Sequence, residues 1–300
     1  MNVLHYLRAS LVLLVIVLNT LLLILPLYFL TLLKILFKSE GMQVRTSKGL
    51  NFIAETWISI NIATIKLISR PKFLIQGADN LERNQWYFVT SNHQSWADIL
   101  VLQHVLNRRI PLLKFFLKQE LIKVPLLGHA WWALDFPFMK RYTREEIERD
   151  PSLKGKDLET TRKACEKFAY FPTSVMNFFE GTRFTEEKHA QQTSPYKHLL
   201  KPKSGGTAFT LNAMGGRLAI LLDVTIIYPP TSIKNLMAYL GGAIKNIDVI
   251  VTQRPIPAWT SQGDYQEDPE FRARFQEWIS NLWREKDELI EARLQRHTQQ

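Results

Sequence analysis

The stretch from Ala9 to Leu33 constrains the fold more than any other part of the chain, because it holds 25 residues without a single charge. About 20 apolar residues in a helix are enough to cross the roughly 30 Å hydrocarbon core of a bilayer. A secretory signal peptide usually has a shorter apolar region, of about 7 to 15 residues, followed by a small-residue cleavage site. No such site lies in Lys34-Ile-Leu-Phe-Lys38, which follows directly. We therefore predict an uncleaved N-terminal membrane helix.

The charges on the two sides of this stretch are unequal. Arg8 is the only Lys or Arg before it, whereas Lys34, Lys38, Arg45 and Lys48 follow it closely. An excess of positive residues marks the cytoplasmic side of a membrane segment. The sequence therefore predicts that the chain after the stretch faces the cytoplasm.

A second apolar stretch, from Leu50 to Ser69, contains Glu55 and Lys66. Charges inside a membrane span are costly, so this stretch fits an amphipathic helix in the membrane interface better than a second span. Packing of the same helix on a soluble domain agrees equally well with its periodicity. We expect membrane-anchoring helices in residues 1–70 and, after Arg70, a cytosolic-facing domain in residues 71–300 that ends in an amphipathic helix.

Composition limits the classes of protein that fit. A hydrophobic content of 46% in 300 residues is enough for one large core. The 38 Lys and Arg exceed the 28 Asp and Glu, and this charge of +10 favours an anionic partner such as a membrane surface, a phosphorylated substrate or nucleic acid. The single Cys165 excludes an internal disulfide and a multi-Cys zinc site, and its helical surroundings indicate a buried apolar residue.

Short apolar runs alternate with helical patterns after residue 71, and this alternation predicts an α/β fold with a central, mostly parallel or mixed sheet flanked by helices. Strands are predicted at 72–76, 86–90, 136–140, 174–179, 224–228 and 247–252. Helices are predicted at 97–106, at 157–168 and after Asp268, where aromatic residues repeat at helical spacing and indicate a core face.

His93 and Asp98 are five positions apart, which would place them on different sides of a regular helix. A strand that ends near Thr90 and a helix that begins near Ser95 would instead put a turn between them. Asp98 could then reach back to a ring nitrogen of His93, fix the tautomer and stabilise the imidazolium. The spacing alone also fits a surface or structural histidine, but a position at a strand end favours a functional one. We predict that His93 is a catalytic base and that Asp98 orients it.

Two other uses of this segment are weaker. Ser95 is a possible nucleophile beside His93, but the chain has no Gly-x-Ser-x-Gly elbow. A metal site would need more ligands, and His104 and His129 are remote in sequence and lie on apolar segments. We therefore expect no metal.

An apolar strand leads into Glu180-Gly181-Thr182-Arg183. A glycine turn of this kind exposes backbone amides beside an Arg whose fork suits a phosphate. Arg141 follows another apolar strand and could add positive charge. The alternative is an ordinary turn with Glu180 and Arg183 as a surface pair.

Several motifs occur in the order found in a known family. They are Asn92-His93 through Asp98, Asp135-Phe-Pro-Phe-Met-Lys-Arg141, Phe179-Glu-Gly-Thr-Arg183 and, more faintly, Val224 to Tyr228. Together they resemble the conserved blocks of the lysophospholipid (1-acyl-sn-glycerol-3-phosphate) acyltransferases, most closely a bacterial inner-membrane subgroup. The resemblance covers about residues 70 to 230 and implies a glycerolipid acyltransferase-like fold.

The resemblance also implies a reaction. A fatty acyl chain would pass from acyl-CoA or acyl-acyl carrier protein, as co-substrate, to the sn-2 hydroxyl of lysophosphatidic acid or a related lysophospholipid, giving phosphatidic acid. His93 and Asp98 would be catalytic, and the substrate-binding residues would be Arg141, Glu180, Gly181, Thr182 and Arg183. No tightly held cofactor is expected. The expected partners are the phospholipid membrane, the acceptor and the donor, at the bacterial inner membrane with the catalytic domain facing the cytoplasm.

Two other classes of function remain open from the residues alone. A membrane-bound lipid hydrolase or thioesterase could use the same His93 and Asp98 on water. A nucleic-acid or protein-binding module would exploit the charge of +10, but the chain has no recognition motif for one. The apolar region from Leu112 to Leu134 could line an acyl groove, with ordinary core packing as the alternative.

Overall fold

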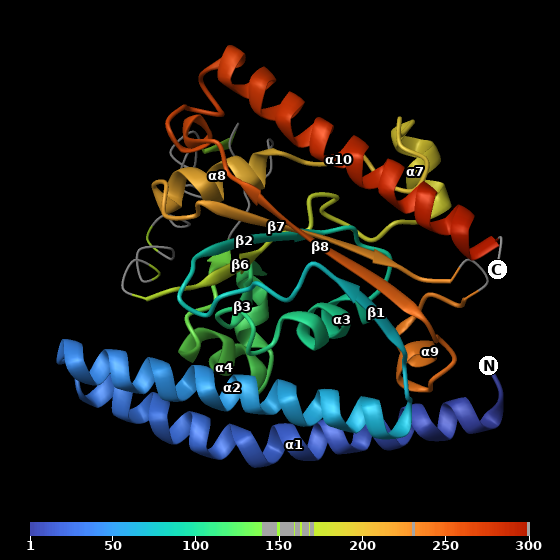
Figure 1. The fold of residues 1–300 in the computed structure, drawn as a ribbon. Helices are drawn as coiled ribbons and strands as arrows, with labels where there is room; N and C mark the ends of the chain where they lie inside the picture. The colour runs from blue at the N-terminus through green and yellow to red at the C-terminus, as the bar shows by residue number, and fades with distance from the viewer. Residues whose placement is uncertain are drawn as a thin grey trace.

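The computed structural model describes residues 1–139, 149–150, 159, 163, 168, 171–229 and 232–298. Helical layers cover both faces of a central sheet of 6 strands (Figure 1). The predicted α/β fold with a mixed sheet flanked by helices is therefore confirmed. Arg141, Cys165 and most of the helix predicted at 157–168 lie outside the described residues.

The sheet joins strands from across the chain. Its order is β1 (Phe73–Gln76), β8 (Ile247–Pro255), β7 (Ile220–Ile227), β2 (Tyr87–Ser91), β6 (Ser174–Met176) and β3 (Leu113–Phe115). Neighbouring strands are parallel except β7 and β8, which are antiparallel. A small second sheet pairs β4 (Leu117–Lys118) with β5 (Phe138–Met139). Every predicted strand is found, although β6 is shorter and β7 begins earlier, whereas β3 and β4 were not predicted.

Both faces of the sheet are buried, as expected for parallel strands between helices. Tyr87 and Val89 of β2 face a core shared with α3 (Ala97–Leu106) and α9 (Leu236–Leu240). Phe88 faces the opposite core, shared with α8 (Gly205–Met214) and α10 (Pro269–Thr298). The aromatic face of α10 lies in that core, as predicted, and Trp283 is fully buried.

The first two helices, α1 (Val3–Leu36) and α2 (Glu40–Ile68), lie side by side and form a hairpin along one edge of the molecule (Figure 1). A buried polar contact sets their register: Asn19 Nδ2 donates to Asn61 Oδ1 at 2.8 Å and to the Trp57 carbonyl at 3.0 Å. Such bonds inside an apolar interface are lost if either helix slides, because their polar groups would then be left without partners.

Both ends of α1 contact the globular part of the chain. Near its C-terminus, Lys34 Nζ lies 2.7 Å from Asp135 Oδ2, just after α4 (Leu127–Ala133). Near its N-terminus, the backbone of His5 lies so close to Gly241 that a Cβ there would come 2.4 Å from the His5 carbonyl oxygen. By length and composition α1 could cross a membrane, yet its two ends touch the same domain.

The helix α2 begins ten residues earlier than the apolar stretch that predicted it, and one of its faces packs on the globular part of the chain. Glu55 is buried, and both of its oxygens accept from Arg83 Nη2 at 2.7 Å. Asn107, at the end of α3, donates to Ser59 Oγ at 2.9 Å. Phe52 and Leu67 are exposed. The helix therefore packs on the domain and still presents apolar side chains to its surroundings.

Candidate active site

The loop between β2 and α3 carries His93 and leads into Asp98 at the start of α3, and Asn92 fixes this loop. The Asn92 amide donates to the Ile226 carbonyl and its oxygen accepts from the Ile226 amide, both at 2.8 Å. The Asn92 side chain thus bonds to the backbone of β7 just beyond the last paired residues of β2 and β7. The loop thus leaves the carboxyl ends of parallel strands, where α/β folds commonly place ligands.

His93 Nδ1 lies 2.9 Å from Asp98 Oδ2. The same oxygen accepts from the backbone amides of Gln94 at 2.6 Å and Ser95 at 2.8 Å, so the loop is folded around the carboxylate. Asp98 is fully buried in the first turn of α3. The predicted turn and contact are confirmed. Because Nδ1 donates to a carboxylate, Nε2 of the neutral ring keeps its lone pair and can accept a proton.

Tyr228 holds the other oxygen of Asp98, and sequence reasoning missed this role. The Tyr228 hydroxyl donates to Asp98 Oδ1 at 2.6 Å. Burial, followed by the charge of Asp98, raises the pKa of Tyr228 well above its usual value, so the hydroxyl stays a donor. Tyr228 follows β7, whose end lies beside that of β2, and this position at the shared sheet edge was the available signal.

Side chains beside the pair restrict what it can do. The ring of Phe178 stacks on that of His93, with centroids 3.9 Å apart and planes at 13°. Ser95 is buried, and its Oγ accepts from the Ala97 amide at 3.1 Å. Ser95 therefore supports the start of α3, and the nucleophile interpretation has no structural support.

The segment that contains Glu180 and Phe184 contacts the backbone of His93. The His93 amide donates to Glu180 Oε1 at 2.8 Å, and the His93 carbonyl accepts from the Phe184 amide at 2.7 Å. Glu180 Oε2 accepts from the Leu200 amide at 3.1 Å, and Glu180 is fully buried. Burial raises the pKa of Glu180 to about 7. Glu180 was predicted to contact substrate, but its geometry is that of a residue that joins two loops behind the site.

Gly181 occupies a turn that requires glycine. Its φ is +67°, and a Cβ would come 3.1 Å from Lys203 Cδ. The Gly181 amide was expected to be exposed, but it donates to the Phe178 carbonyl at 2.9 Å because the turn closes on itself. Within the part of the chain that the structure describes, the amides of Thr182 and Arg183 donate to no protein group. The turn therefore offers these two amides to an anion.

Two residues position Arg183: Trp96, which lies in the same motif as His93, and Lys188, which sequence reasoning missed. Its guanidinium carbon lies 4.9 Å from the ring centre of Trp96, a separation typical of a cation–π contact. Lys188 Nζ, in α7 (Glu186–Gln192), donates to Thr182 Oγ1 at 2.8 Å and to the Arg183 carbonyl at 3.1 Å. The turn is thus held from both sides, and positive charge gathers beside it.

His93 and the turn open onto one cleft with a volume of about 690 Å³. Its lining combines apolar and polar side chains: His93, Phe115, Phe116, Leu117, Lys118, Glu120, Met176, Asn177, Phe178, Gly181, Thr182 and Arg183. The volume falls within the range of about 300 to 1,000 Å³ typical of sites for small ligands.

The sequence left open whether the region from Leu112 to Leu134 lines an acyl groove or packs in the core, and the structure shows residues of both kinds. Phe115, Phe116 and Leu117 line the cleft. Leu112 and Leu134, in contrast, pack with the α1–α2 hairpin. The pairing of β4 with β5 also brings Phe138 and Met139, from the motif Asp135–Arg141, beside Leu117 and Lys118 of the cleft. Arg141 follows two residues later, outside the described residues.

The described residues contain no group of three His, Cys, Asp or Glu side chains that could hold a metal ion. His104 lies apart from the site, stacked on Phe73 with ring centroids 4.1 Å apart. Burial, followed by the charges of Lys66 and Arg109, lowers the pKa of His104 to about 4. It is a neutral core histidine at physiological pH.

Comparison with known proteins identifies the family. The profile described as Acyltransferase matches residues 72–234, which is more than half of the chain. The chain belongs to the acyltransferase family. The matched region includes the His93–Asp98 pair, the 180–183 turn and Tyr228, whereas the α1–α2 hairpin and α10 lie outside it.

Relatives within the acyltransferase family include enzymes that act on lysophosphatidic acid. Mouse 1-acyl-sn-glycerol-3-phosphate acyltransferase gamma is 28% identical over 188 residues, 59% of this chain and 45% of the relative. The human delta enzyme is 27% identical over 210 residues, 66% of this chain and 50% of the relative. The chain thus spans about half the length of these curated relatives.

One solved structure in the comparison is the 1-acyl-sn-glycerophosphate acyltransferase of Thermotoga maritima. It is 19% identical, with 91% of this chain and 97% of that chain covered, at a TM-score of 0.44. The superposition is too loose to add to the family assignment.

Proposed function

We propose that this acyltransferase is a 1-acylglycerol-3-phosphate O-acyltransferase, which transfers a fatty acyl chain from a thioester to the sn-2 hydroxyl of lysophosphatidic acid or a related lysophospholipid. The product is phosphatidic acid. One observation carries the proposal: His93, oriented by Asp98, and the turn that carries Arg183 line the same cleft. A base beside an anion-binding turn suits a substrate that contains both an alcohol and a phosphate.

His93 is the general base of the proposed reaction. Its Nε2 takes the proton of the acceptor hydroxyl while that oxygen attacks the thioester carbonyl, so that a C–O bond forms. The tetrahedral intermediate then breaks its C–S bond, and the departing thiolate receives the proton. Asp98 stabilises the positive ring between these steps. Each partner of Asp98, including Tyr228, helps to keep this carboxylate in place.

The phosphate of the acceptor binds at the turn. Arg183 and the two free amides at positions 182 and 183 supply the donors. Lys188 adds charge while holding the turn. We include Arg141 in this set because the motif from Asp135 to Arg141 resembles a substrate-binding block of the family. Positioning acceptor and base together accounts for a large part of the rate in reactions of this type.

The apolar wall of Phe115, Phe116 and Leu117 suits the acyl chain, whose burial contributes about 0.8 kcal/mol per CH₂. Either acyl-CoA or acyl-acyl carrier protein would serve as donor. We expect the reaction to need no resident cofactor, because a thioester already carries the activated acyl group.

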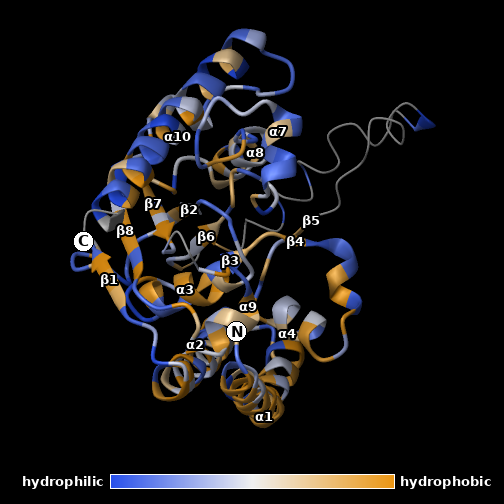
Figure 2. Cartoon of the chain, turned by 90° about the vertical axis from the view of Figure 1, so that its right-hand side faces the viewer, coloured by the Kyte–Doolittle hydropathy of each residue, from blue (hydrophilic) through white to orange (hydrophobic). Residues whose placement is uncertain are grey.

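The enzyme binds to a membrane through the α1–α2 hairpin. A helix of 34 residues is about 51 Å long. Because both of its ends contact the domain, α1 fits a position along the membrane surface rather than a span across it. The apolar outer face of α1 is visible in Figure 2 and would contact lipid. We propose the cytoplasmic face of a bacterial inner membrane as the location.

Incubation of the purified protein with labelled acyl-CoA tests the reaction. Phosphatidic acid should form when lysophosphatidic acid is present, and little label should be released without it. Release of labelled fatty acid at the same rate with and without acceptor would support a thioesterase and contradict the proposal.

A further inference from the structure

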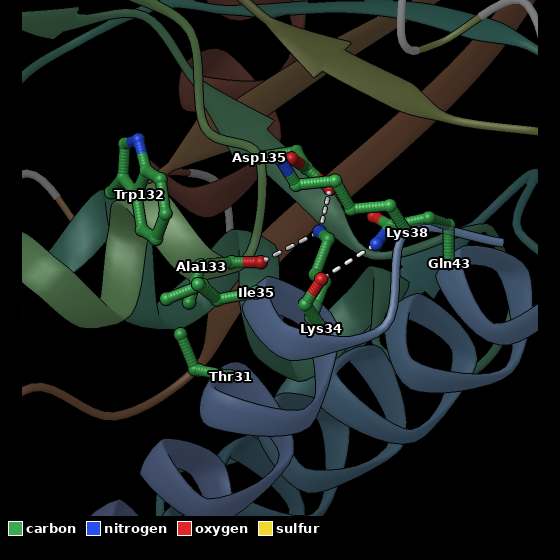
Figure 3. A pocket seen from close by; sticks show the side chains of 8 residues that line it. All are labelled: Thr31, Lys34, Ile35, Lys38, Gln43, Trp132, Ala133 and Asp135. Atoms are coloured by element: carbon green, nitrogen blue, oxygen red, sulfur yellow. Dashed lines mark hydrogen bonds and ion pairs between the residues drawn. The ribbon is translucent and has the colours of Figure 1, made fainter.

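A second pocket lies away from the active-site cleft, at the end where α1 turns into α2. Its volume is about 360 Å³. The lining comes from α1, α2, α4 and the segments after α1 and α4 (Figure 3): Thr31, Lys34, Ile35, Lys38, Gln43, Trp132, Ala133 and Asp135. We propose that this pocket binds one anionic glycerophospholipid, with the phosphodiester at Lys38 and the acyl chains along α1. The inference uses the membrane association proposed above but is independent of the chemistry.

The charge of the pocket suits one phosphodiester. Lys34 is already neutralised by Asp135 at 2.7 Å, and it also donates to the Ala133 carbonyl at 3.2 Å. Lys38 is exposed and has no partner among the described residues. Glu40 is also exposed but does not line the pocket. Among the described residues that line the pocket, Lys38 is therefore the cation without a carboxylate partner, and its charge suits the single negative charge of a diester.

The C-terminus of α1 at the pocket is compatible with an anion, because two of its backbone acceptors are already satisfied. Gln43 Nε2 donates to the carbonyls of Lys34 at 2.6 Å and Phe37 at 2.9 Å.

The apolar side of the pocket indicates that the ligand has acyl chains. In Figure 3 Trp132, Ala133 and Ile35 lie on one side, and Lys38, Gln43 and Asp135 lie on the other. Ile35 is 51% exposed and Trp132 is 44% exposed. Large apolar residues continue from the pocket along the outer face of α1: Leu36, Leu32, Phe29, Leu25 and Leu22. A free phosphate or an acidic protein would make no use of this apolar face.

The test measures binding rather than turnover, so a failed acyltransferase assay would not affect it. Full-length protein in an uncharged detergent is titrated by calorimetry with dioctanoylphosphatidylglycerol. Glycerophosphoglycerol, which lacks the chains, and dioctanoylphosphatidylcholine, which carries no net charge, are titrated in parallel. We expect one bound phosphatidylglycerol and at least tenfold weaker binding of the other two compounds.

Lys38→Gln removes the uncompensated cation, and Lys48→Gln removes an equal charge from the same hairpin outside the pocket. Loss of a charged hydrogen bond should weaken binding about tenfold in the first variant, and the second should stay within about twofold of wild type. Both lysines are exposed, so both variants should fold. Equal weakening in the two variants would show that only general charge matters. Equal binding of the chain-free compound would show a simple phosphate site. Either result overturns the proposal.

Discussion

The hydroxyl of Tyr228 donates to Asp98 Oδ1 at 2.6 Å, across 130 positions of sequence. The other oxygen of Asp98 holds His93 and two loop amides. The carboxylate therefore links the end of β7 to the proposed catalytic base. Through this link, a residue that does not face the reacting atoms helps to hold the carboxylate that orients His93.

Tyr228→Phe removes this donor and keeps the ring. Without it the charge on Asp98 is less dispersed and attracts the proton of His93 more strongly. We expect kcat to fall about tenfold and the acidic limb of the pH–rate profile to move to higher pH. Tyr239→Phe is the matched control, because the buried Tyr239 hydroxyl has no partner among the described residues. A profile that moved equally in both variants, or in neither, would contradict this positioning role.

Arg183→Gln should chiefly raise KM for lysophosphatidic acid, by about tenfold or more, because a charged donor to the phosphate is lost. The value of kcat should change less. Arg284→Gln removes the same charge from an exposed position on α10, outside the cleft, and should leave KM unchanged. Steady-state rates over a range of acceptor concentrations measure both constants. A fall in kcat at constant KM in Arg183→Gln would place the residue in the chemical step instead.

Glu180 makes the stability of the protein depend on pH. Its pKa is raised from 4.5 in the unfolded chain to about 7 by burial, so the folded state binds the extra proton between these values. The stabilisation is complete below pH 4.5 and is lost as pH rises through about 7. Over this window it amounts to about 3 kcal/mol. Urea unfolding at several pH values measures this effect. The free energy of unfolding of wild type minus that of Glu180→Gln should fall as pH rises from 4.5 to about 7, because Gln does not titrate. A constant difference would contradict the raised pKa.

The catalytic pair could be predicted because its determinants are local. The strand that ends at Ser91 and the helix that begins at Ala97 are both visible as apolar patterns, and they leave only the turn that Asp98 needs to reach His93. The glycine turn before Arg183 was also predicted. Its hydrogen bonding was not, because whether the Gly181 amide is exposed depends on how the turn closes on Phe178.

The parts that were missed depend on contacts between distant segments. The end of a predicted strand places Tyr228 at the edge of the sheet, but it does not show that the hydroxyl meets Asp98. Glu180 resembles a surface residue until the loops at His93 and Leu200 close around it. The strand β3 was missed because a charged residue, Lys114, lies in its centre. That lysine is buried and its Nζ lies 5.0 Å from the ring centre of Phe168. The contacts of the two ends of α1, at Asp135 and at Gly241, likewise join segments far apart in sequence and were not predicted.

The central claim is that His93 is the base that activates the acceptor hydroxyl. The most direct measurement compares wild type, His93→Ala and His129→Ala in the formation of phosphatidic acid from lysophosphatidic acid and labelled acyl-CoA. His129 is an exposed histidine of α4 and serves as the matched control. We expect His93→Ala to lose roughly 10²- to 10⁴-fold in turnover, with an unchanged thermal unfolding curve, and His129→Ala to remain active. A folded His93→Ala variant that kept turnover close to that of wild type would contradict the account.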